Sequence, residues 1–156
     1  MEYETLADDP VEKEVPANLQ NYNLYLDEES GSGGDGSIST MEPEGSQKEA
    51  SILSGVEFRS DDLISHITIY GEGSASEVNL YIFLKFKGQE GSTADLTYTL
   101  NSVGGAAYTV SQELTSPCQD SVLPGSGCAW TINEISFDVP EDGFTVEQGS
   151  QLRLQI

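Results

Sequence analysis

The many carboxylates of this sequence include pairs of the type that hydrolyse glycosides, but none has the aromatic sequence context that a sugar-cleaving cleft needs. Nucleophilic catalysis has fewer candidate residues. His66 is the single histidine, so a serine, histidine and carboxylate arrangement would have to use it. The sequence contains no Gly-x-Ser-x-Gly segment of the kind that presents a nucleophilic serine at a sharp turn. His66 lies in the β-branched run Ile64–Tyr70, where a strand side chain beside core residues is the simpler interpretation. We therefore predict that the chain has no catalytic residues and is not an enzyme.

Two cysteines, Cys118 and Cys128, bracket a loop that contains Pro124, Gly125 and Gly127. Their spacing does not fit a Cys-x-x-Cys motif, and one histidine cannot complete a four-ligand zinc site. The spacing predicts a disulfide that closes the connection between two neighbouring strands. Closing a loop of this length stabilises a fold by about 3 kcal/mol in the chain-entropy model. A disulfide also indicates an oxidising compartment, so we expect an extracellular or cell-surface location.

Carboxylates in predicted loops are the candidate metal ligands, because Ca²⁺ is bound by carboxylate and carbonyl oxygens. None of them has the spacing of an EF-hand, and Asp also favours turns without binding an ion. Ca²⁺ is the one cofactor that the sequence suggests, and both interpretations stay open. The candidate residues are Asp61, Asp62, Asp120, Glu141 and Asp142.

The clearest strand of the sequence is Glu77–Lys87, which is apolar along one face. Its other face carries Tyr81 and Phe83, with Lys85 beside them. Exposed aromatic side chains on a sheet stack against sugar rings or pack against another protein. Tyr81, Phe83 and Lys85 are therefore the candidate ligand-binding residues, unless the strand is central and buries both faces.

The chain is strongly acidic, with 27 Asp and Glu residues against 6 Lys and Arg and a formal net charge of −21. Such a surface repels phosphate groups, so we predict that the chain binds neither nucleic acid nor an anionic membrane surface. No segment approaches the ~18 consecutive apolar residues of a membrane span. The first fifty residues hold 13 of the carboxylates, so much of the charge belongs to a solvated tail.

Apolar and polar residues alternate with a period of two through most of the chain after residue 50, which predicts an all-β fold. We expect an antiparallel β-sandwich. Trp130 and Ile132 are out of phase with Ile135 and Phe137, and this slip predicts a β-bulge. The expected strands are Asn21–Leu26, Ser37–Met41, Ser51–Leu53, Val56–Arg59, Ile64–Tyr70, Glu77–Lys87, Leu96–Leu100, Tyr108–Leu114, Trp130–Val139, Phe144–Val146 and Leu152–Ile156.

The composition divides the chain into a segment and a domain. Residues 1–20 are charged and interrupted by prolines, which indicates a disordered or linker segment. Residues 21–156 form the predicted sandwich, with a flexible, acidic loop rich in Gly and Ser at 27–50. The last strand has no closing turn, which suggests a missing final strand and an edge near Ile156 that could pair with another chain.

Several strand patterns resemble one known family. Asn21–Leu26 followed by Ser37–Ser39 is similar to the opening of the jelly-roll domain that ends X-prolyl dipeptidyl peptidases and related esterases. Ile64–Phe86 is similar to that domain's aliphatic strand, turn and long strand. Trp130–Val139 and Phe144–Ile156 are similar to its closing strands. The resemblance implies a galactose-binding-like jelly roll with a carbohydrate-binding or surface role, as on archaeal secreted and cell-surface proteins. The family's hydrolase domain and its triad are absent from this sequence, so the peptidase activity is not implied.

Together these features predict an extracellular, non-catalytic β-sandwich module that binds a glycan or a protein surface. One alternative is a structural subunit of a surface layer or filament, which would assemble with itself through the edge near Ile156. Another is an accessory-domain fragment of a hydrolase. Sedimentation with and without Ca²⁺ distinguishes the first two, because a subunit should form ordered polymers and a module should stay monomeric.

Overall fold

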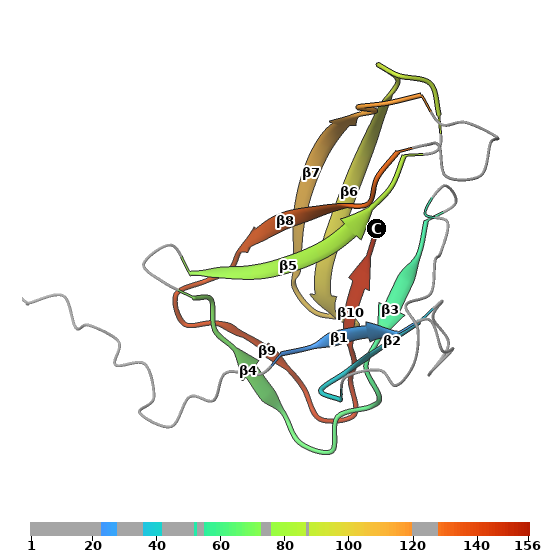
Figure 1. The fold of residues 1–156 in the computed structure, drawn as a ribbon. Helices are drawn as coiled ribbons and strands as arrows, with labels where there is room; N and C mark the ends of the chain where they lie inside the picture. The colour runs from blue at the N-terminus through green and yellow to red at the C-terminus, as the bar shows by residue number, and fades with distance from the viewer. Residues whose placement is uncertain are drawn as a thin grey trace, which may run out of the picture.

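The computed structural model describes residues 23–27, 36–41, 52, 55–72, 76–86, 88–119 and 128–156. These ranges contain ten strands and no helix, so the predicted all-β class is confirmed (Figure 1). Within them there is accordingly no helix with the length and apolar character of a membrane span. The strands are β1 Tyr25–Asp27, β2 Gly36–Ser39, β3 Glu57–Arg59, β4 Ile67–Ile69, β5 Glu77–Leu84, β6 Thr93–Ser102, β7 Ala107–Thr115, β8 Thr131–Asp138, β9 Phe144–Val146 and β10 Leu152–Gln155.

Six of these strands form one sheet in the order β1-β2-β3-β10-β6-β7. Its neighbours are antiparallel except for β2 and β3, which run parallel. Two antiparallel ribbons, β4–β9 and β5–β8, account for the other described strands. The predicted antiparallel pairing is therefore present in several sheets, and these pairings do not in themselves define a jelly roll.

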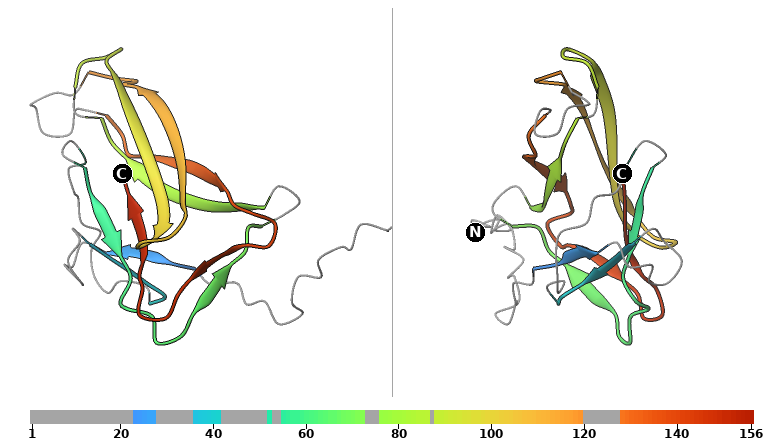
Figure 2. Two further views of the ribbon diagram at one scale, coloured as in Figure 1. Left: turned by 180° about the vertical axis from the view of Figure 1, so that it is seen from behind. Right: turned by 45° about the vertical axis from the view of Figure 1, so that its right-hand side comes forward.

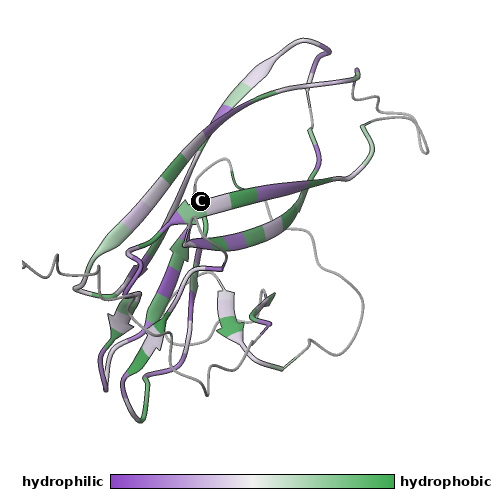
Figure 3. Ribbon diagram, turned by 90° about the vertical axis from the view of Figure 1, so that its left-hand side faces the viewer, coloured by the Kyte–Doolittle hydropathy of each residue, from purple (hydrophilic) through white to green (hydrophobic). Residues whose placement is uncertain are grey.

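The core lies between the large sheet and the two ribbons. The β5–β8 ribbon crosses β6 and β7 in Figure 1, and the right-hand view of Figure 2 shows it as a separate layer. Tyr98 of β6 and Phe137 of β8 are 0% and 1% exposed. The rings of Tyr108 in β7 and Phe144 in β9 also meet across the layers, with centroids 5.0 Å apart. This layering fits a β-sandwich, and Figure 3 shows the alternating apolar and polar bands along the strands that it requires.

β10 lies inside the large sheet. Leu154 pairs with Phe58 of β3 on one side and with Leu100 of β6 on the other. Ile156 continues the pairing, because its backbone N–H donates to the Val56 oxygen at 3.0 Å and its oxygen accepts from the Val56 N–H at 3.0 Å. The predicted open edge near Ile156 is therefore wrong. Alternation in sequence shows that one face of a strand is buried, but it does not say which strands flank it.

The β5–β8 pairing is continuous. It runs from Glu77 opposite Asp138 to Leu84 opposite Thr131 without an extra residue, so the predicted β-bulge is wrong. The change of phase has another cause. Ile135 faces the core and is 3% exposed, whereas Ile132 lies on the outer face of the ribbon and is 59% exposed. The apolar residues of this strand thus change faces along a regular backbone.

Other differences from the expected strands concern their ends. β1 begins at Tyr25, and residues 21–22 lie outside the described residues. β4 is limited to Ile67–Ile69, and Ile64 before it is 93% exposed. The expected segment 1–20 and most of the loop 27–50 also lie outside the described residues, as do Ser51 and Leu53 of one expected strand.

Two glycines in turns provide a test of how tightly β4 packs against the turn after β8. Gly143 has φ +73°, and a Cβ there would lie 2.5 Å from the Ile69 backbone oxygen. Gly149 has φ +76°, with nothing within 4 Å of its Cβ position. We expect Gly143→Ala to lower the free energy of unfolding by about 2 kcal/mol and Gly149→Ala by about 1 kcal/mol. Urea unfolding of both variants measures the difference, and equal losses would mean that the β4 contact does not constrain the turn.

Candidate functional site

The outer face of the β5–β8 ribbon carries a row of exposed apolar side chains. Phe83 and Ile132 are directly opposite each other and are 57% and 59% exposed. Tyr81 lies two residues before Phe83 on the same face of β5 and is 58% exposed, and Trp130, just before β8, is 45% exposed. These side chains lie together because residues two apart share a face and opposed residues sit side by side. We call this surface the aromatic face and define it by Tyr81, Phe83, Lys85, Trp130, Ile132 and Glu134.

The aromatic face has a polar contact at each of its two ends. The Lys85 Nζ lies 6.0 Å from the centroid of the Trp130 ring, at the limit of a cation–π contact. At the other end, the Tyr81 hydroxyl donates to Glu134 Oε1 at 3.1 Å. Phe83 and Ile132 lie between these contacts, so the apolar centre has a cation on one side and a carboxylate on the other.

The structure thus places the three predicted ligand-binding residues, Tyr81, Phe83 and Lys85, on one surface. Tyr81 and Phe83 are exposed, so the alternative of a strand buried on both faces is wrong. Sequence reasoning missed Trp130 and Ile132, because their change of phase relative to Ile135 was interpreted as a β-bulge and not as a change of face. Aligning β8 against β5 with an unbroken register would have placed both residues opposite Phe83 and Lys85.

The hydroxyl of Tyr81 titrates in an acidic setting. The hydrogen bond to Glu134 raises the pKa of Tyr81 above its ordinary value of 10.0, and the negative charges of Glu134 and Glu72 with slight desolvation act in the same direction. The neutral hydroxyl is the favoured form. The hydrogen-bonded Tyr81 hydroxyl therefore stabilises the folded chain at a pH below the pKa of tyrosine in the unfolded chain, near 10. This stabilisation is lost as the pH rises through the pKa of Tyr81 in the folded chain.

Glu134→Gln should lower the pKa of Tyr81 toward its ordinary value, because the variant removes the charge that disfavours the phenolate. Alkaline titration of ¹³C-labelled tyrosine rings by NMR measures this pKa. Burial raises the pKa of Tyr98, which lies in the core and away from Glu134, so its titration should be the same in both proteins. An unchanged pKa for Tyr81 would contradict the hydrogen bond.

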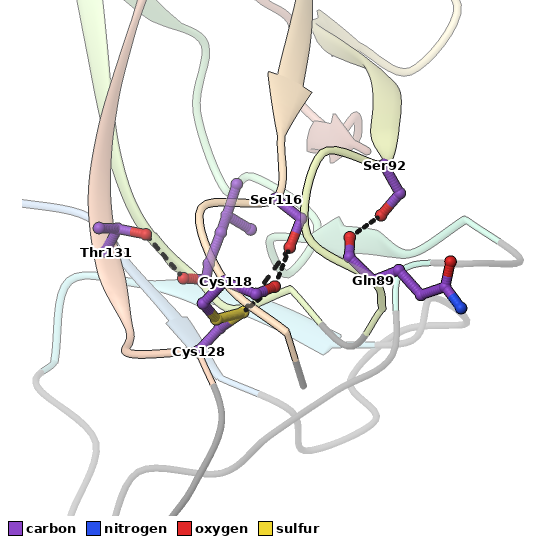
Figure 4. The surroundings of a disulfide bond; sticks show 7 residues. Gln89, Ser92, Ser116, Cys118, Cys128 and Thr131 are labelled. Carbon is purple, nitrogen blue, oxygen red and sulfur yellow. Dashed lines mark hydrogen bonds between the residues drawn. A yellow bond between two sulfur atoms is a disulfide. The ribbon is translucent and has the colours of Figure 1, made fainter. Parts of the chain in front are cut away.

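A disulfide joins Cys118 to Cys128, as predicted, with their Cα atoms 5.5 Å apart (Figure 4). It connects the segment after β7 to the segment before β8. The hydroxyl of Ser116, a buried residue, donates to the Cys118 backbone oxygen at 2.8 Å. The Ser116 backbone N–H donates to the Ser92 oxygen at 2.8 Å, so the disulfide is also held against the start of β6.

The disulfide lies close to the aromatic face along the chain. Cys128 is two residues before Trp130, and the next residue, Thr131, donates from Oγ1 to the Leu84 backbone oxygen at 3.3 Å. The covalent bond fixes one end of this segment and the hydrogen bond fixes the other. Trp130 is therefore held between two anchored points.

The four candidate calcium ligands that the structure describes do not form one cluster. Asp61 and Asp62 follow β3, whereas Glu141 and Asp142 lie in the turn between β8 and β9, and all four are exposed. Asp62 Oδ1 accepts from Gln151 Nε2 at 2.9 Å. Asp120 lies outside the described residues. Among the residues that are described, no three His, Cys, Asp or Glu side chains are grouped so that they could hold a metal ion.

The remaining polar candidates have other positions. His66 precedes β4 and is exposed, so it is not the core-facing strand residue that its sequence context suggested. The two arginines contact side chains of the large sheet. Arg59 forms an ion pair with Glu57, and Arg153 lies 3.6 Å from the same carboxylate and donates to Asn101 Oδ1 at 3.0 Å. These contacts link β3, β10 and β6, so the arginines contribute to the sheet.

No family model, curated protein or solved structure gives a significant match to this chain. The resemblance to the jelly-roll domain of the X-prolyl peptidases therefore stays a prediction.

Proposed function

We propose that the chain is a non-catalytic binding module that binds its partner on the aromatic face. The exposed Phe83–Ile132 pair, flanked by Trp130 and Tyr81, carries this proposal. Contiguous exposed apolar side chains on a soluble protein mark interaction surfaces, and Trp and Tyr are among the residues that contribute most to binding.

The preorganisation of the aromatic face also supports binding. The register of β5 with β8, the disulfide before Trp130 and the Tyr81–Glu134 hydrogen bond restrict its side chains before any partner arrives. A surface that is already ordered loses less conformational entropy on association, so more of its contact energy contributes to affinity.

The jelly-roll fold and the extracellular location form part of the same proposal. A galactose-binding-like jelly roll located outside the cell would present the aromatic face to a glycan or to a protein surface, and the disulfide supports an oxidising location. The alternative of a subunit that assembles through the strand near Ile156 loses its basis, because β10 is paired on both sides.

Trp130 allows a direct test, because it is the single tryptophan of the chain and lies on the aromatic face. Oligosaccharides and candidate surface proteins that lack tryptophan would be titrated while its emission is recorded. We expect a partner to shift this emission and to bind Phe83→Ser/Ile132→Ser about tenfold more weakly than the native chain.

Ile64→Ser is the matched control, since Ile64 is 93% exposed and lies outside the aromatic face. This variant should bind as the native chain does. A partner that binds all three proteins equally well would show that the aromatic face is not the binding site.

A further inference from the structure

We propose that the partner of the aromatic face is a protein surface that presents apolar side chains next to lysine or arginine residues. This inference rests on the proposed function and adds the class of partner. It follows from two independent features, the Phe83–Ile132 centre of the aromatic face and the distribution of charge along the β5–β8 ribbon.

The centre of the aromatic face fits protein side chains better than sugar rings. Ile132 is 59% exposed and offers no flat surface on which a sugar ring could stack. The Tyr81 hydroxyl, a natural donor to a sugar, already donates to Glu134. Phe83 and Ile132 thus present an aromatic and an aliphatic group side by side, which apolar side chains of a partner would cover with the loss of water from both surfaces.

Charge along the ribbon indicates which side chains should surround that apolar contact. Beyond Tyr81 and Glu134, the outer face continues to Glu77, which is directly opposite Asp138. Glu72 extends this end through a β-bridge to Glu77. We call Glu72, Glu77, Glu134 and Asp138 the acidic end of the ribbon. Lys85, beside Trp130, is the cation at the opposite end.

The acidic end is complementary to a basic partner. Opposite charges across an interface raise the association rate and disfavour partners of the wrong sign. The formal net charge of −21 acts in the same direction at longer range, so it opposes acidic partners and also the approach of a second copy of this chain. A partner with lysines or arginines beside its apolar residues satisfies both requirements.

Three synthetic peptides test this inference with the full chain. Each alternates Leu and Phe with one polar residue, which is Lys in the first, Ser in the second and Glu in the third. None contains tryptophan, so Trp130 emission reports binding alone. At low ionic strength we expect the Lys peptide to bind at least about tenfold more tightly than the Ser peptide, and the Glu peptide not to bind. Neutral oligosaccharides should leave the emission unchanged.

Two matched pairs of variants separate specific binding from general attraction to an acidic protein. Phe83→Ser/Ile132→Ser should weaken binding of the Lys peptide about tenfold, whereas Ile64→Ser should not. Glu77→Gln/Asp138→Asn should weaken it severalfold. Asp95→Asn/Glu113→Gln removes the same charge from a directly opposed pair on β6 and β7, and it should have a smaller effect.

The outcomes distinguish this inference from the proposed function. Equal binding of the Lys peptide to all variants would overturn both, because it would show unspecific electrostatic attraction. An oligosaccharide that shifts Trp130 emission in the native chain but not in Phe83→Ser/Ile132→Ser would leave the site in place and overturn the class of partner. The native chain could also form a dimer at high salt that Phe83→Ser/Ile132→Ser abolishes. This result would assign the aromatic face to a second copy of the chain and would overturn the inferred class of partner.

Discussion

Replacing both cysteines by serine should lower the free energy of unfolding by about 3 kcal/mol. Cys118 and Cys128 are 10 residues apart, and the bond between them limits how far the unfolded chain can open at this point. The loss should be large relative to the total, because domains of this size are stable by only about 5–15 kcal/mol. The double variant avoids the reactive free thiol that either single variant would leave.

Urea unfolding of the native chain and of Cys118→Ser/Cys128→Ser measures this difference. Reductant should destabilise the native chain by a similar amount and should leave the double variant unchanged. Thiol titration of the unfolded native chain without reductant should find no reactive thiol. Two reactive thiols, or a double variant as stable as the native chain, would contradict a stabilising disulfide.

Phe137→Ala should cost more still, about 3–5 kcal/mol. Phe137 is 1% exposed and lies opposite Val78 on the core side of the β5–β8 ribbon. Removing its ring would leave a cavity between the ribbon and the large sheet, because the rigid strands on either side cannot move to fill it. Urea unfolding followed by circular dichroism would measure the loss.

Phe83→Ala is the matched control, because it removes the same group from the paired strand. Phe83 is 57% exposed, so the expected loss is below about 1 kcal/mol. The comparison bears on the proposed site as well as on the core. Similar losses for the two variants would mean that Phe83 is packed in the folded protein, and the aromatic face would then not be available to a partner.

The local features of the fold were predictable from the sequence. Alternation places Tyr81 and Phe83 on one side of β5 and Leu80 and Ile82 on the other, because side chains of a strand point alternately to its two faces. The spacing of Cys118 and Cys128 was enough to predict their bond. Both predictions depend only on residues that are near each other along the chain.

Features that depend on distant residues were not predictable in this way. The position of β10 between β3 and β6 is decided by which strands are available to pair, and its own alternation does not encode this. The exposure of Trp130 and Ile132 depends likewise on β5, which sets the register of β8. The sequence alone therefore located half of the aromatic face, and the paired strand supplied the rest.

The central place of β10 also affects how the chain folds. Gln155 donates to Glu57 across a separation of 98 residues, so the middle of the large sheet is built from contacts of high contact order. Such contacts close slowly, because a long loop loses its freedom before any pairing compensates for it. On the ribosome, β3 and β6 emerge well before the strand that joins them, and each exposes an unpaired edge in the interval. The nascent chain therefore passes through a stage at which it can associate wrongly with other chains, and this stage ends when residues 152–155 are inserted into the sheet.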